Sequence, residues 1–504
     1  MANGFDDFKS QKKKNDIYHQ PKDILIKTMN RTVSLSLLIM AFHIIFLSRV
    51  CVGQTDNTLH TGQSDTILLV GQIDTTLNVA QTDTTLRIGQ PDTLFSSVQS
   101  DTTLLVGETD TTLHVVQTDT ISIQPDPFHR EYTLIYALKH DVLNSSENLR
   151  TGLKLFSDAY YRGLAPKIKN KTLRIITGIT WSLVGKWSSM LWPHEFGHML
   201  RTNQVGGKFS FVKLQFPGVL GKLELPADAT PDHHILAVIG GFEANYLIAR
   251  DIQYDFFRHD GLYNDEYGVA FGNRIMYPLY TYVFAHQSPK DPETWELEGG
   301  DPVNFTKLIW RKGGWEVFNA DGSVNQDLVK FYNKVGILSV IWNLLDINLY
   351  RQAGVFFGNE LKGRKPYYFG NENFSWSYGT FFNTSILGPE LYFNNYLRIA
   401  GRFYNLCFKY GFPFKNNGLG LSVPDLVKTK KFNLLGQVDF WSQDFYGFFG
   451  KGIAVSSTME FNVANGFNIL TQIGYKTKGY LAGKTTRDGL FGYIGINYDF
   501  NKGN

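Results

Sequence analysis

Residues 192–200 read Trp-Pro-His-Glu-Phe-Gly-His-Met-Leu, and the interpretation of the whole chain starts from this stretch. On a helix, His194 and His198 lie about 40° apart around the axis, so that both imidazoles can reach one metal ion. Glu195 lies beside the pair, where it can accept a proton from a water molecule and return it to a leaving group. The spacing therefore predicts a metal site that has its own general base.

A catalytic zinc site needs a third protein ligand and leaves one position open for water. Glu243 is the best candidate, because an acid on the mostly apolar stripe of a helix is costly to bury without a partner. An ion pair with Arg250 or another base is the alternative explanation for this acid. Asn245 is a candidate to orient a ligand by hydrogen bonding.

The motif resembles the His-Glu-x-x-His helix of the zincin metallopeptidases, and a glutamate from a later helix is similar to the gluzincin pattern. This resemblance implies zinc held by His194, His198 and Glu243, with Glu195 as the catalytic base. It also implies a hydrolase that cleaves peptide bonds in a peptide or protein substrate. Activity remains an expectation, because a fold does not establish it.

Two related patterns fit less well. The metzincin pattern is excluded because it requires glycine and histidine where this chain has Arg201 and Gln204. Residues 190–261 also resemble the site-2 intramembrane proteases, which take an aspartate ligand from an Asp-Gly segment. That resemblance implies Asp260 as the alternative third ligand.

Apolar residues recur at helical spacing in the middle of the chain. The predicted helices cover residues 134–144, 149–163, 172–190, 193–203, 233–251, 273–286 and 326–350. Pro193 suits the first turn of a helix, and Gly197, Gly240 and Gly241 would permit close helix packing. Residues 287–325, rich in Pro, Gly, Asp and Trp, are predicted to form a loop. No segment is an uninterrupted apolar run of about eighteen residues, so none is a secure transmembrane helix.

From residue 366 to 500 the apolar period changes from helical to two. The segments 404–410, 432–440 and 467–475 alternate apolar and polar residues, which predicts about eight strands with one apolar and one polar face. Two architectures fit: an antiparallel β-sheet packed on the helices, or an outer-membrane β-barrel of about eight strands. Residues 495–500 resemble the terminal strand of bacterial outer-membrane barrels, which favours the barrel. The expected fold class is α+β.

The N-terminal residues resemble a secretory signal. Translation is expected to begin at Met29, and the apolar stretch Leu35–Leu47 is too short to span a bilayer comfortably but suits a signal peptide. Cleavage is expected near Gly53, and an uncleaved membrane anchor is the alternative.

Residues 54–124 contain a nine-residue tandem repeat, Gln-x-Asp-Thr-Thr-Leu-x-Val-Gly. Calcium-binding β-rolls also use nine-residue repeats, but they need paired glycines that are missing here. The tract is predicted to be an exposed spacer that is flexible or weakly β-forming.

The length of 504 residues suggests two to four structural units. The expected boundaries are 1–53 for the extension and signal peptide, 54–124 for the repeats, 125–365 for the helical domain and 366–504 for the sheet or barrel. A net charge of +3 gives no electrostatic case for nucleic acid binding, and two cysteines exclude a disulfide scaffold.

Together these patterns predict an exported bacterial protein with a zinc metallopeptidase-like domain. We expect it in the outer membrane, in contact with outer-membrane lipid, or alternatively in the periplasm. The rival interpretation is a non-enzymatic surface or barrel protein with a structural or vestigial metal site. Glu195 discriminates the two, because a structural site needs the metal ligands but not this acid.

Overall fold

The computed structural model describes residues 130–499 apart from six short gaps, and it also describes strands between Thr66 and Gln117. The gaps are residues 138–140, 216–217, 285–287, 297–299, 357–362 and 444–449. The predicted signal segment lies outside the described residues.

The repeat tract belongs to a unit of its own. Its described strands are β1 (Thr66–Val70), β2 (Leu77–Val79), β3 (Thr84–Ile88), β4 (Phe95–Ser97), β5 (Thr102–Leu105) and β6 (Thr112–Gln117). Strand β1 pairs in parallel with β3, and β2 pairs in parallel with β4, so that residues two repeats apart become neighbours. One repeat has nine residues, an odd number, but two repeats have an even number. Residues two repeats apart therefore occupy the same face of a strand.

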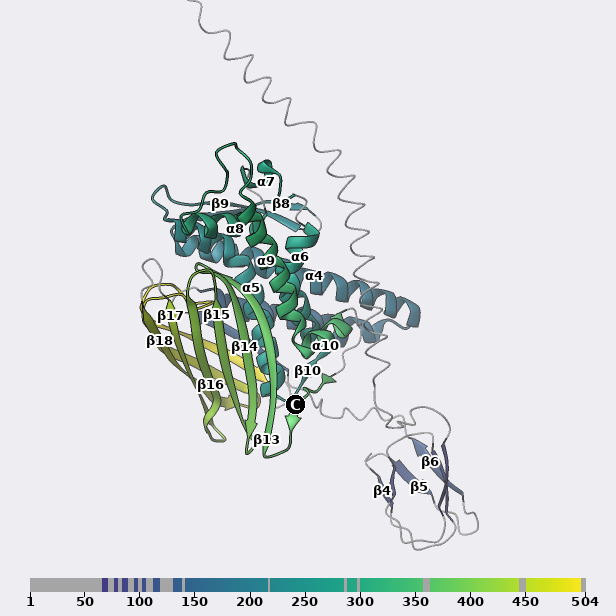
Figure 1. The fold of residues 1–504 in the computed structure, drawn as a ribbon. Helices are drawn as coiled ribbons and strands as arrows, with labels where there is room; N and C mark the ends of the chain where they lie inside the picture. The colour runs from purple at the N-terminus through teal and green to yellow at the C-terminus, as the bar shows by residue number, and fades with distance from the viewer. Residues whose placement is uncertain are drawn as a thin grey trace, which may run out of the picture. The chain divides into compact units, whose positions relative to one another are not determined.

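The second unit begins near residue 127 and combines helices with one large sheet (Figure 1). Its helices are α3 (Val142–Asp158), α4 (Lys171–Gln204), α5 (Pro231–Arg258), α6 (Asn264–Leu279), α7 (Pro292–Glu296), α8 (Asp301–Lys312), α9 (Gln326–Leu344) and α10 (Ile347–Phe356). Asp141, Asn170 and Thr230 cap α3, α4 and α5, each accepting a backbone N–H of the first turn. Of the described helices, none combines the length and apolar composition needed to cross a membrane.

Most predicted helical segments lie in helices, with four differences, one of which is that the segment 326–350 is divided between α9 and α10. Residues 134–144 were predicted to be helical, which is wrong for the first of them, because β7 (Glu131–Ala137) pairs with the last strand of the sheet. The segments 172–190 and 193–203 form the single helix α4, with Pro193 inside it. The segment 287–325 was predicted to be a loop, but it contains α7 and α8.

The large sheet has ten strands in the order β12-β13-β14-β15-β16-β17-β18-β19-β20-β7. The strands from the C-terminal part are β12 (Phe369–Gly370), β13 (Phe374–Ser385), β14 (Gly388–Ile399), β15 (Arg402–Gly411), β16 (Asn416–Lys428), β17 (Phe432–Gln443), β18 (Lys451–Ala464), β19 (Phe467–Lys476) and β20 (Gly489–Asp499). All neighbours are antiparallel, and the eight long strands β13–β20 match the predicted number. The sheet is open, with β12 and β7 as its edges, so the expected closed barrel is not formed by the described strands.

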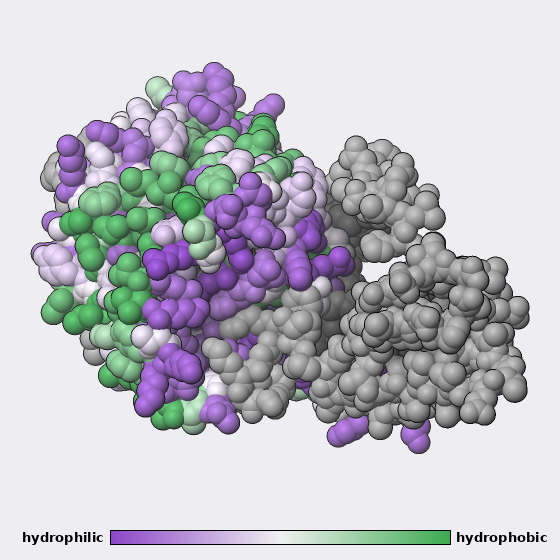
Figure 2. Space-filling model, turned by 90° about the horizontal axis from the view of Figure 1, so that it is seen from below, coloured by the Kyte–Doolittle hydropathy of each residue, from purple (hydrophilic) through white to green (hydrophobic). Residues whose placement is uncertain are grey.

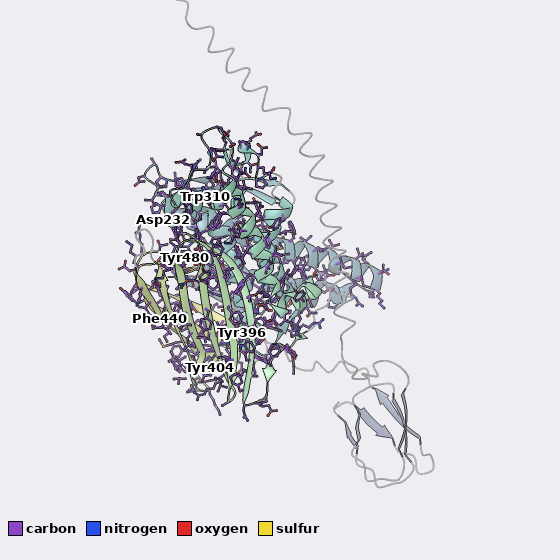
Figure 3. The ribbon with its side chains drawn as sticks, viewed as in Figure 1. Asp232, Trp310, Tyr396, Tyr404, Phe440 and Tyr480 are labelled. Carbon is purple, nitrogen blue, oxygen red and sulfur yellow. The ribbon has the colours of Figure 1, made fainter. Side chains whose placement is uncertain are left out.

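The two faces of the sheet have opposite polarity. In β17, Asn433, Gln437 and Asp439 line a cavity of about 300 Å³ that α3 and α5 also line, whereas Phe440 is 48% exposed on the other face. Figure 2 shows apolar residues gathered on the outside of this unit on the side of the strands. Figure 3 shows Phe440 on the strands and Tyr480 where the strands meet the helices. The polar face therefore turns inward and the apolar face outward.

Helix α5 is the centre of the helical layer. Ile235, Ile239 and Leu247 are fully buried in it, and it packs against α3, α4, α6, α8 and β13. It meets α4 where Gly240 faces Gly197: a Cβ added to Gly240 would lie 2.3 Å from the Gly197 carbonyl oxygen. The two backbones can approach this closely only because both residues lack side chains.

We therefore expect Gly240→Ala to lower the free energy of unfolding by at least about 1–3 kcal/mol, because the added methyl group meets backbone that cannot move aside. Urea unfolding followed by circular dichroism measures the change. The matched control is Gly152→Ala in α3, where nothing lies within 4 Å of the added Cβ. Equal unfolding midpoints for the two variants would contradict this account of the contact.

Candidate metal centre

The two histidines of the motif share one buried face of α4. His194 Nδ1 lies 2.9 Å from Asn245 Oδ1, and His198 Nδ1 lies 2.8 Å from the carbonyl oxygen of Ala237, both on α5. In the neutral form of each ring, Nδ1–H can thus donate to an oxygen, which leaves Nε2 with its lone pair. Such an outer hydrogen bond fixes the tautomer and orientation of a metal-binding histidine.

Asn245 is itself held in place. Its Nδ2 donates to the carbonyl oxygen of Met190 at 2.8 Å and to Asn273 Oδ1 at 2.7 Å. These two bonds turn its oxygen toward His194. The structure thus places Asn245 in the orienting position that the sequence indicated.

The third group is Asp301, the first residue of α8. Its Oδ2 lies 2.9 Å from His194 Nε2 and 3.1 Å from His198 Nε2, and the two Nε2 atoms are 3.2 Å apart. Three ligands at about 2.0–2.2 Å from a tetrahedral metal would be separated by about 3.3–3.6 Å. His194, His198 and Asp301 therefore fit a single metal ion, and they form the metal-ligand cluster found among the described residues.

Charge also favours a cation at this position. Burial opposes ionisation of Asp301, but the neighbouring His198 and His194 lower its pKa below its usual range. The Asp301 side chain is 21% exposed, whereas the side chains of the two histidines are almost fully buried. Asp301 is therefore the most exposed of the three ligand groups.

Glu195 lies beside the cluster without belonging to it. The residue is only 7% exposed, and burial raises the pKa of its carboxyl group, although His194 and His198 oppose the shift. A carboxylate with a raised pKa is a better proton acceptor near neutral pH. Glu195 therefore lies close to the cluster without being one of its three ligand groups.

Tyr280, the first residue of the short π-helix Tyr280–Phe284 that follows α6, lies beside His194. Its ring stacks on His194 with centroids 6.0 Å apart. Burial raises its pKa far above the usual value, and the charges of Asp301 and Glu195 act in the same direction. Tyr280 therefore keeps its hydroxyl proton at neutral pH.

Glu243, the expected third ligand, is not in the cluster. Its carboxylate forms a two-pronged ion pair with Arg201 at 2.6 and 2.5 Å, and accepts bonds from Tyr480 Oη and the Gly483 N–H, each at 2.8 Å. The alternative explanation, an ion pair of Glu243 with a base, is therefore confirmed, and the base is Arg201 of α4 rather than Arg250, which pairs with Asp251. Arg201 comes three residues after His198, so the two residues share the face of α4 that is turned to α5. This spacing is the sequence signal for the pairing.

Asp260, the alternative ligand, also lies elsewhere. It has a positive φ of 59° in the turn after α5, and its carboxylate is 3.4 Å from Arg398 of β14. Asp301 was missed because residues 287–325 were expected to be a loop. The signal that could have found it is Gly300-Asp301-Pro302, since an acid and a proline are typical of the first turn of a helix.

Gly241 of α5 lies directly against the two imidazoles. A Cβ there would be 2.6 Å from His194 Nδ1 and 2.6 Å from His198 Nε2. Any larger residue would displace the ligands. The expectation that glycines permit close packing here is therefore confirmed.

The donor set is two imidazole nitrogens and one carboxylate oxygen. Such a set suits zinc and several other first-row divalent ions, and three protein ligands leave a position open. With a base beside that position, the arrangement can activate a water molecule for attack on a polarised carbonyl.

The metal affinity is expected to rise with pH up to about 9. Burial disfavours the charged form of His198, but the Asp301 carboxylate outweighs it and raises the pKa of His198 to about 9. Below that pH a proton occupies the ligand and must leave before metal binds. The affinity should therefore fall about tenfold for each pH unit below that pKa.

Competition with a chelator of known affinity, repeated from pH 6 to pH 9, measures this dependence. Once the chelator's own protonation is corrected for, an affinity that does not change over this range would contradict proton competition at His198.

No family model matches the chain, and neither the curated proteins nor the solved structures contain a match. The assignment of the site therefore rests on its own geometry.

Proposed function

We propose that this protein is a zinc-dependent peptide hydrolase in which His194, His198 and Asp301 hold the metal and Glu195 is the general base. The observation that carries the proposal is the convergence of three ligand atoms with a buried, uncoordinated acid beside them. A structural site would need the three ligands only. The resemblance to zincins in the His-Glu-x-x-His motif supports peptide bonds as the substrate class.

Zinc at this site would polarise the substrate carbonyl and make a water molecule more acidic. Glu195 would take the proton of the attacking water and transfer it to the leaving amine. Tyr280 would donate its hydroxyl proton in a hydrogen bond to the carbonyl oxygen as negative charge develops there. Asn245 and the Ala237 carbonyl would hold the two imidazoles in orientation throughout.

We also propose that the outer face of the sheet contacts lipid, with the bacterial outer membrane as the location and the periplasm as the alternative. In support, the outward side chains of the strands are apolar and exposed while the inward ones are polar. Large exposed apolar surfaces mark interaction sites. This polarity is the reverse of that of a soluble sheet and is typical of strands that face lipid.

The rival function keeps the sheet as the functional part and the metal site as structural. The site-2-like alternative loses its ligand, because Asp260 pairs with Arg398 instead of joining the two histidines.

Glu195→Gln decides between the enzyme and its rival. The amide keeps the shape of the side chain but cannot accept the proton, so we expect peptide hydrolysis to fall about 10²–10⁴-fold. The metal content should stay unchanged, because Glu195 is not a ligand.

Cleavage of a mixed peptide library, followed by mass spectrometry, measures the effect, with exposed Glu293→Gln as the matched control. A metal-loaded parent that cleaves nothing, or a Glu195→Gln variant as active as the parent, would leave the site structural.

A further inference from the structure

We propose that an aromatic cluster beside Glu195 binds a large apolar side chain of the peptide substrate and so determines which peptides are cleaved. The aromatic cluster consists of Trp192 and Phe196 from α4 and of Phe209 and Phe211 from β8 (Lys208–Gln215). The inference rests on the proposed peptide hydrolysis and names the substrate feature that the site would recognise.

The four rings form one continuous surface. Phe211 is central: its ring centroid lies 6.0 Å from that of Trp192, 6.3 Å from that of Phe196 and 5.0 Å from that of Phe209. Edge-to-face contacts at these distances stabilise aromatic groups, and they can accept a further apolar group in the same way.

The cluster is open to solvent although it adjoins a buried site. Trp192 is 40% exposed and Phe211 is 47% exposed, whereas Glu195 is only 7% exposed. Aromatic side chains so close to a buried functional group are costly to leave in water unless something covers them. A substrate is an occupant that this position can receive during each reaction.

The hairpin joins the cluster to the reacting groups. Strand β9 (Gly218–Glu224) brings Gly221 next to the base: a Cβ on Gly221 would lie 3.2 Å from Glu195 Oε2 and 2.4 Å from the ring of Phe209. The missing side chain lets the Phe209 ring lie across β9 beside the carboxylate. A substrate bond positioned at Glu195 would therefore have its next side chains within reach of the rings.

The same hairpin can hold an extended peptide. Within the described residues, β8 and β9 form a two-stranded sheet, so each strand has an edge without a strand partner. Such an edge binds peptides by backbone hydrogen bonds, with alternate side chains entering neighbouring pockets. The nearby Glu195 carboxylate would repel an acidic side chain. These features favour a peptide with an apolar residue over a lipid as the occupant.

The test measures binding without turnover. Full-length Glu195→Gln protein is loaded with zinc, and its affinity for peptides is measured by titration calorimetry. The peptides consist of alanine and serine, and each contains a single Phe at a different position. The peptide that carries Phe at one particular position should bind about 10-fold or more tightly than the peptide without Phe, since burying a Phe side chain contributes about 1.5–3 kcal/mol. Adding Trp192→Ala or Phe211→Ala should abolish that preference and leave the metal content unchanged.

Trp315→Ala is the matched control, because Trp315 is similarly exposed at 41% but stacks on Phe414 rather than on a ring of the aromatic cluster. A Phe preference that survives in both cluster variants would overturn the proposal. The proposal would also be overturned if the two cluster variants kept the peptide affinity but bound phosphatidylethanolamine–phosphatidylglycerol vesicles more weakly. The cluster would then be a lipid contact.

Failure of the subsite is distinguishable from failure of the proposed function. A parent that cleaves nothing, while its Phe preference depends on Trp192, would reject hydrolysis and keep the binding site. A parent that cleaves peptides without any preference for an apolar residue would reject the subsite and keep the hydrolase.

Discussion

The site depends on the close contact between α4 and α5. Gly197 and Gly240 bring the two backbones together, and Gly241 leaves room for the imidazoles. At this separation α5 can supply both hydrogen-bond acceptors that orient the histidines, the Ala237 carbonyl and Asn245. A methyl group at the contact would move the ligands relative to these acceptors. Helix packing and metal geometry are therefore set by one constraint.

The same contact links the helices to the sheet. Glu243 of α5 forms an ion pair with Arg201 of α4. Its carboxylate also accepts hydrogen bonds from Tyr480 and Gly483, which lie in the loop between β19 and β20. A buried carboxylate with this many donors is satisfied, but removing any charged partner would leave an unpaired charge in the interior. The loop of the sheet therefore stabilises the contact between α4 and α5 without contributing a metal ligand.

The sequence predicts local structure better than it predicts tertiary contacts between segments that are distant in the chain. His194 and His198 share a helix face by their spacing alone, and β13–β20 follow from the period of two. The third ligand depends on which distant segment folds over that face, and local spacing contains no information about this. Glu243 and Asp301 were both acids in need of a partner, and only the tertiary structure assigns one to Arg201 and the other to the histidines. The edge of the sheet beside β20 is likewise formed by a distant segment, β7, which comes from the other end of the unit.

The central claim is that Asp301, and not Glu243, completes the metal site. The most direct measurement is the zinc content of the purified full-length chain, of Asp301→Ala and of Glu243→Gln, with circular dichroism to establish that each variant is folded. The account predicts one zinc ion in the parent and in folded Glu243→Gln, and little in Asp301→Ala. Zinc retained in Asp301→Ala but lost from folded Glu243→Gln would contradict it.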